Sequence, residues 1–117
     1  MRYVKVTNVS RGTVLATRAG AATDSRERRT GLLKHTSLPE GEGLWIAPCE
    51  AVHTFGMRFA IDLVFIDRRN RVVKVCENVP RRRIAAALTA DSVLELPAGT
   101  VARTRTQKGD ELKFEGV

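Results

Sequence analysis

Residues 59–66, FAIDLVFI, decide the fold together with the polar DRRN at 67–70 and the valine-rich RVVKVC at 71–76. The first segment is apolar on both faces of an extended chain except at Asp62, and this pattern predicts a central strand that is covered on both sides. The four polar residues have the chemistry of a turn. We therefore expect the segments before and after them to pair as an antiparallel hairpin.

Short strand patterns recur on either side of this hairpin. They alternate or are rich in β-branched residues, and they fall at residues 3–9, 13–18, 44–47, 92–96 and 110–114. The first two are separated by a Gly-containing turn and are expected to form an N-terminal hairpin. Residues 84–88, IAAAL, are ambiguous between strand and helix.

One helix is predicted over residues 25–34. Thr23 or Asp24 can cap its first turn, and no proline interrupts the segment. Leu32 and Leu33 would then make the main apolar contacts of this helix.

Together these elements predict an α+β fold that is mainly β, with a strongly curved, barrel-like antiparallel sheet of about seven short strands and one or two short helices. A second helical turn is expected after the break at Pro97-Ala98-Gly99. The chain has 117 residues, of which 43% are hydrophobic and 28% charged, as is typical of one globular domain. We therefore treat residues 1–117 as a single domain.

The sequence also narrows the cellular setting. The longest apolar runs fall short of the ~20 residues of a membrane-spanning helix, and the start, MRYVKVTNV, has no long apolar stretch of a secretory signal. We expect a cytoplasmic protein without a membrane partner. Cys49 and Cys76 are the two cysteines. Reduced thiols are the simpler interpretation, although one bridge between them stays open.

Asp62 is the most informative polar residue, because a carboxylate inside an apolar strand costs several kcal/mol without a partner. We expect at least one side-chain or backbone donor to hold it, and favour His53, Thr54 or an arginine such as Arg29 or Arg58 as its source. A His–Asp pair fixes the imidazole tautomer and can exchange protons. Such a pair could hold two strands in register, line a binding pocket or serve catalysis, and the residues alone leave all three open.

Cys49, His53 and Met57 are spaced four apart, and all three residue types bind soft metals. In an extended chain the same spacing puts them on one face with apolar neighbours, where cysteine and methionine are ordinary core residues. We favour the core interpretation and expect neither a metal nor another cofactor.

The order of motifs resembles that of the DUF192 family, also called UPF0127. The resemblance rests on RTGLL at 29–33, the Leu- and Gly-containing segment at 38–45, HTFGMRFAID at 53–62, LELPAG at 94–99 and the Gly-Asp pair at 109–110. It spans roughly residues 5–114. The chain departs from the family pattern at Leu33, where methionine is common, and at Ala60, where proline is common.

This resemblance implies a small, compact, β-rich domain in a family without an assigned activity. Seven positions of this chain match the motif and are carried over as candidate ligand-binding residues: Arg29, His53, Thr54, Met57, Arg58, Asp62 and Glu95.

The leading functional hypothesis is a small binding module. Its pocket would be lined by His53, Thr54, Met57 and Asp62, and an arginine would attract a small anion or an acidic group on a peptide. The first alternative is a hydrolase that uses a His53–Asp62 acid–base pair. The second is a structural or interaction protein without a small ligand, which a fully packed His53 would favour.

The positive net charge suggests a nucleic-acid partner, since 20 Lys and Arg residues against 13 Asp and Glu residues give a net charge of +7. The arginines are scattered, however, and aromatic residues make up only 5% of the chain. Single-strand binding requires exposed aromatic residues interleaved with basic ones. We therefore expect no specific nucleic-acid partner.

The corresponding prediction is weak binding of DNA and RNA that disappears as salt is raised, because scattered arginines contact phosphates without recognising bases. Fluorescence polarisation with labelled single- and double-stranded oligonucleotides of several sequences measures it. Sub-micromolar binding at physiological salt, with preference for one sequence or structure, would contradict the expectation.

Overall fold

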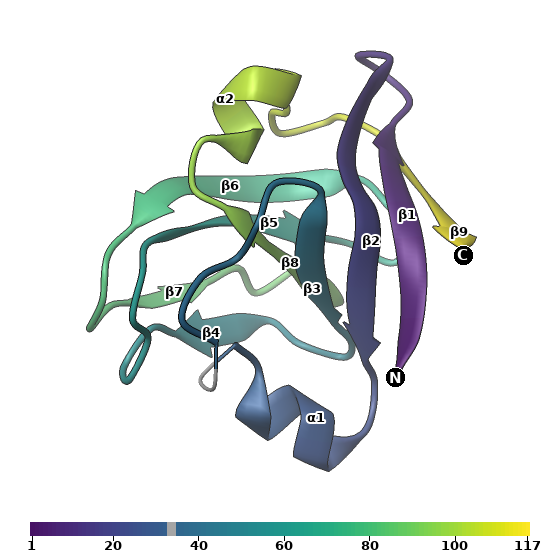
Figure 1. Cartoon of the computed structure of the whole chain (residues 1–117). Coiled ribbons are helices and arrows are strands. Elements are labelled where there is room, and N and C mark those ends of the chain that lie inside the picture. Colours follow the sequence, from purple (N-terminus) through teal and green to yellow (C-terminus); the bar gives the residue numbers. More distant parts are fainter. Residues whose placement is uncertain (33–34) are drawn as a thin grey trace.

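A hairpin of β5 (Ile61–Ile66) and β6 (Val72–Val79) lies at one end of a seven-stranded sheet in the computed structural model, which describes residues 1–32 and 35–117 (Figure 1). All six residues of β5 are buried, and the strand pairs antiparallel with β6 on one side and with β8 (Ser92–Pro97) on the other. The hairpin turn places Asn70 at a positive φ of 61°. The central strand and its turn are therefore confirmed.

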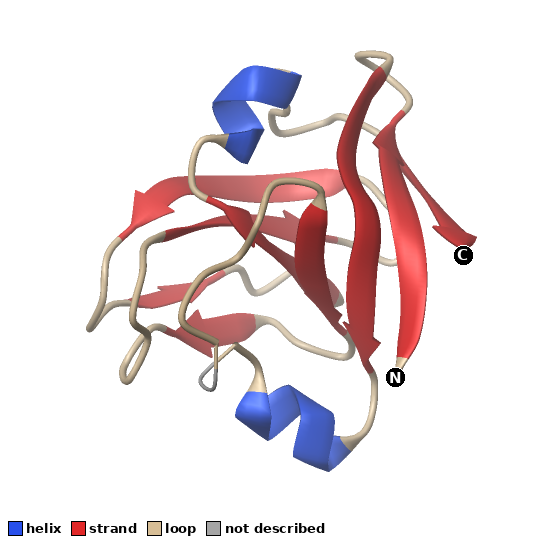
Figure 2. Ribbon diagram, viewed as in Figure 1, coloured by secondary structure: helices blue, strands red, loops and turns tan. Residues whose placement is uncertain are grey.

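The rest of the sheet continues from β8 in the order β3, β2, β1, β9. These strands are β1 (Arg2–Asn8), β2 (Thr13–Ala22), β3 (Glu42–Ile46) and β9 (Leu112–Gly116). Every neighbouring pair is antiparallel except β2 and β3, which run parallel. The sheet curls into a half-barrel, as Figures 1 and 2 show. The expected strongly curved, mainly β fold is confirmed.

Two short helices accompany the sheet. α1 (Ser25–Thr30) begins with a capping box, in which the Asp24 side chain accepts a hydrogen bond from the Glu27 N–H at 2.8 Å and the Glu27 carboxylate reaches back. The helix is shorter than predicted because Gly31, at φ 48°, ends it. Leu32 is buried in the core, whereas Leu33 lies outside the described residues.

The second helix, α2 (Thr100–Thr104), follows the Pro-Ala-Gly break as expected. Neither described helix is long and apolar enough to cross a membrane.

A second, two-stranded sheet is the element that the sequence patterns did not predict. It consists of β4 (Ala51–His53) and β7 (Ile84–Ala86), which pair antiparallel with His53 opposite Ile84. β7 covers the first three residues of the run IAAAL at 84–88, which the sequence left ambiguous between strand and helix. Both strands have three residues, so neither is long enough to show a period of two.

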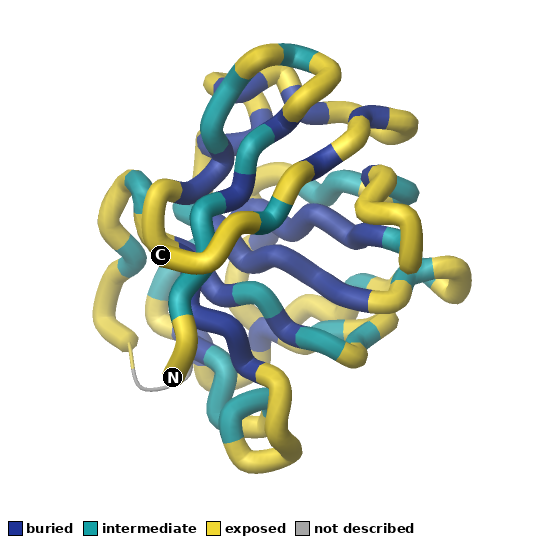
Figure 3. Tube along the Cα trace, turned by 90° about the vertical axis from the view of Figure 1, so that its right-hand side faces the viewer, coloured by how far each residue is buried: buried dark blue, intermediate teal, exposed yellow. Residues whose placement is uncertain are grey.

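The large sheet separates two hydrophobic clusters. Because side chains alternate along a strand, Val64 and Ile66 of β5 belong to one cluster and Leu63 and Phe65 to the other. β8 alternates in the same way, with Leu94 and Leu96 joining the first cluster and Val93 the second. Figure 3 shows that the buried residues follow the strands and that most exposed residues lie in the connections.

Asp62 is fully buried on the face of the first cluster, against α2. Its Oδ1 accepts a hydrogen bond from the Asn78 N–H at 2.8 Å, and its Oδ2 accepts from the N–H groups of Gly99 at 3.1 Å and Val101 at 2.8 Å. The expectation that a donor holds Asp62 is confirmed. Backbone groups, one of the two expected kinds of donor, hold it at the end of β6 and the start of α2, whereas the favoured residues His53, Thr54 and an arginine do not.

We predict that Asp62→Asn lowers the free energy of unfolding by about 2 kcal/mol or more, since the amide removes the charge and turns an N–H group toward backbone donors. Denaturant unfolding of the two proteins measures the change. Asp91→Asn is the matched control, because Asp91 is exposed. Equal stability of Asp62→Asn and wild type would contradict a structural role for this carboxylate.

Candidate functional site

A cavity of about 470 Å³ lies on the opposite face of the sheet from Asp62, between α1 and β4. Four apolar side chains contribute to its walls: Leu32, Ile46, Val52 and Met57. The polar groups around it come from α1, from the segment that leads into β4 and from β8. Residues distant in the sequence thus meet at one hollow because the short β4–β7 sheet stands beside the large one (Figure 1).

Glu95 is the buried polar residue of this cavity. It lies opposite Leu63 and Leu44 in the sheet, so its side chain points to the second cluster, away from Asp62. Only 5% of the residue is exposed, and its Oε1 has no hydrogen-bond partner among the described residues. Burial raises the pKa of this carboxyl to about 7 from an ordinary value of 4.5.

The C-terminal end of α1 covers this carboxyl. A Cβ on Gly31 would lie 3.9 Å from Glu95 Oε1, so the helix cap approaches the acid closely. The positive φ of Gly31 lets the chain turn there without strain. The conformation that ends the helix therefore also places α1 against Glu95.

Two arginines of α1 line the cavity but differ in what they contact. Arg28 donates to the Thr23 carbonyl at 2.6 Å and to the Ser25 hydroxyl at 3.4 Å, so its guanidinium is held on the helix itself. Arg29 is exposed and forms no hydrogen bond or ion pair with any described residue. Among the described residues that line the cavity, Arg29 therefore offers a guanidinium that is available to a ligand.

Cys49, His53 and Met57 all line this cavity. Burial raises the pKa of the Cys49 thiol, which donates to the Ala51 carbonyl at 3.1 Å. A protonated thiol is a poor nucleophile and a poor metal ligand. Within residues 1–32 and 35–117, no three His, Cys, Asp or Glu side chains gather closely enough to hold a metal ion. Cys49 and Cys76 are both free thiols.

The predicted site therefore divides into two parts. Arg29, His53, Met57 and Glu95 line the cavity, whereas Asp62 lies on the other face of the sheet with both oxygens bonded to backbone N–H groups. The expected pairing of His53 with Asp62 is wrong for this reason. His53 instead is exposed, with its ring centroid 5.9 Å from that of Phe55.

Two further candidates lie outside the cavity lining. The Thr54 hydroxyl is buried, donates to the Pro80 carbonyl at 2.7 Å and accepts from the Arg83 N–H at 2.8 Å. These two hydrogen bonds hold the loop at residues 80–83 against the end of β4. Arg58 is exposed and is not part of the cavity lining.

The arrangement suits binding more than nucleophilic catalysis. The cavity combines an apolar wall, a carboxyl without a partner and an unpaired guanidinium. A small molecule with two polar ends could bond to both groups while its body contacts the wall.

The chain belongs to the DUF192 family. The family model, described as "Uncharacterized ACR, COG1430", matches residues 6–114. No curated protein matches the chain.

Two solved structures have a similar fold. One is a protein of unknown function from Novosphingobium aromaticivorans DSM 12444, 24% identical with a TM-score of 0.81, and the match covers 95% of this chain and 83% of that one. The other is described as a "putative transcription regulator" from Sinorhizobium meliloti 1021, 23% identical with a TM-score of 0.83, and the match covers 97% and 92%. At this level of identity the likeness establishes the fold.

Glu95 gives a prediction about pH. Unfolded, this carboxyl ionises near pH 4.5, whereas in the folded chain it ionises near pH 7. The folded state therefore binds more protons between these values, so the contribution of Glu95 to stability falls as pH rises through this window, by about 3 kcal/mol in total.

Denaturant unfolding from pH 4 to pH 8 tests this. Glu95→Gln should remove the fall, so that the variant gains stability relative to wild type between pH 4.5 and pH 7. The same pH profile in both proteins would show that the carboxyl is solvated or paired.

Proposed function

We propose that this protein is a binding module for a small acidic molecule, which occupies the cavity beside α1. The observation that carries the proposal is the buried Glu95 Oε1 without a partner. Such an oxygen costs free energy in the free protein, and a ligand that supplies a donor recovers it. The other two buried carboxylates among the described residues, Asp62 and Asp110, each accept three hydrogen bonds.

The cavity supports a specific ligand chemistry. Arg29 supplies a guanidinium for a carboxylate or phosphate. Glu95, as a neutral acid below pH 7, both donates and accepts, so it suits a hydroxyl or amide group. The four apolar side chains suit a short hydrocarbon body between these ends. We therefore expect hydroxy acids, acylated amino acids or dicarboxylic acids with a few carbon atoms.

The hydrolase alternative has lost the pair on which it depended, because Asp62 is on the other face of the sheet. Cys49 does not replace it, since burial keeps its thiol protonated. A packed His53 would have favoured the structural alternative, and His53 is exposed instead. Of the three hypotheses, ligand binding is the one that gives a role to Arg29 and Glu95, which line the cavity.

A titration with a panel of these acids, followed by ¹H–¹⁵N NMR, tests the proposal. We expect shifts of the amides of Gly31, Val52 and Glu95 in a saturable manner. Arg29→Gln should weaken binding at least about tenfold, because a charge-assisted hydrogen bond is lost. Glu95→Leu should abolish selectivity for acids that carry a hydroxyl or amide.

The matched control is Arg26→Gln, an exposed arginine of α1 that is not part of the cavity lining. It removes the same charge from the same helix. Equal weakening by Arg26→Gln and Arg29→Gln would reduce the effect to general electrostatics and contradict the site. A panel without any saturable binder at the cavity would contradict the function.

A further inference from the structure

β4 has one edge that is paired with β7 and one that is open. Two backbone bonds flank the pairing: Thr54 N–H to the Arg83 carbonyl at 2.8 Å, and Ala87 N–H to the Glu50 carbonyl at 2.9 Å. Residues 50, 52 and 54 thus turn their backbone polar groups toward β7. Since these groups alternate along an antiparallel strand, Ala51 and His53 turn theirs to the open edge.

No described strand pairs with that open edge. The Ala51 carbonyl accepts the Cys49 thiol, while the His53 N–H and carbonyl have no partner among the described residues. An open strand edge is a template for another extended chain.

The open edge borders the cavity, since Ala51, Val52 and His53 all line it. The Val52 side chain packs against the second cluster. In a strand added beside β4, every second side chain would point in that same direction. Such a side chain would enter the cavity and approach Glu95. The remaining side chains would lie on the outer face of the β4–β7 sheet.

That outer face is apolar and exposed. Phe55 is 49% exposed and Ile84 73%. Ile84 lies opposite His53, whose ring is near that of Phe55, so these residues gather at one end of the small sheet. Their surface suits apolar side chains of an added strand.

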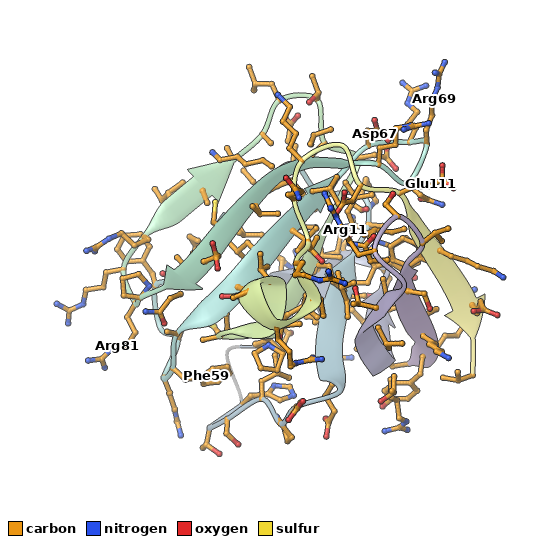
Figure 4. All side chains as sticks on the ribbon, turned by 90° about the horizontal axis from the view of Figure 1, so that it is seen from above. Arg11, Phe59, Asp67, Arg69, Arg81 and Glu111 are labelled. Atoms are coloured by element: carbon orange, nitrogen blue, oxygen red, sulfur yellow. The ribbon has the colours of Figure 1, made fainter. Side chains whose placement is uncertain are left out.

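The charges nearby are mainly positive. The Arg82 N–H donates to the Thr54 carbonyl, which puts the exposed run Arg81–Arg83 at the C-terminal end of β4, on the side that β7 occupies. Figure 4 shows the Arg81 side chain pointing outward from this end of the molecule. Arg29 lies across the cavity on α1, and Glu50 is the acidic residue that adjoins β4. An acidic partner is therefore complementary.

We propose that the ligand group of the cavity is carried by an acidic, extended peptide that adds to the open edge of β4 as a third strand. One of its side chains occupies the cavity and bonds to Glu95, and its acidic residues face Arg29 across the cavity. The inference rests on the proposed function and specifies its ligand: a segment of another protein rather than a free metabolite.

The test uses blocked peptides, Glu-Val-Xaa-Val-Glu, in which Xaa is glutamine, serine, lysine or leucine. Each is titrated into the full-length protein beside the same acetylated, amidated amino acid Xaa alone. We expect at least one peptide to bind roughly tenfold or more tightly than its single amino acid, because backbone hydrogen bonds are added. Amide exchange at His53 should slow on binding of the peptide and not on binding of the amino acid.

Alternating N-methylation provides a control that leaves the protein unchanged. One set of peptides is methylated on the second and fourth nitrogens, and another on the first, third and fifth. The N–H groups of a strand point alternately to its two sides, so one pattern should lose binding roughly tenfold and the other should retain it. Strand addition would be overturned if both methylation patterns weakened binding equally, or if neither pattern weakened it.

The outcomes separate the two proposals. Free acids that bind in a Glu95-dependent manner, without any tighter peptide, would overturn the inference and keep the small-molecule function. Peptides that bind equally well to wild type and to Glu95→Leu would show docking outside the cavity and would overturn the inference, whereas the function falls only if no acid of the panel binds at the cavity either.

Discussion

The Asp62 carboxylate joins β5 to the ends of its two neighbouring strands and to the start of α2. It binds the N–H of Asn78, where β6 ends at a positive φ of 51°, and those of Gly99 and Val101, where α2 begins. A five-residue helix is not stable by itself, so the N-terminus of α2 depends on this acceptor. Three backbone N–H groups in turn supply the hydrogen bonds that the buried carboxylate needs.

Much of the fold could be predicted because the residue types of one segment, and not only their spacing, indicate its structure. A run such as Ile61–Ile66 has to be covered on both sides, and the polar turn after it fixes where the chain reverses. The burial of Asp62 and its need for donors followed from the same run. Its partners could not be predicted, since backbone N–H groups are present at every residue and leave no signature in the sequence.

The cavity was harder to predict for two reasons. β4 and β7 are too short to show alternation, so the small sheet that forms one wall was missed. Glu95 was singled out only by the family resemblance, although the argument used for Asp62 applies to it as well, because SVLELP is also an apolar strand with one acid. The period of two along β5 and β8 then puts the two acids on opposite faces, which the sequence patterns alone did not reveal.

The division between the two faces of the sheet has a consequence for how such proteins diverge. One acid stabilises the fold from the α2 side, and the cavity lies on the other side, against α1 and β4. Substitutions that reshape the cavity therefore leave the network around Asp62 intact, and distant sites contribute to stability almost additively. A lineage can thus change the residues of α1, β4 and Glu95, and with them the shape and charge of the cavity, while the same half-barrel persists.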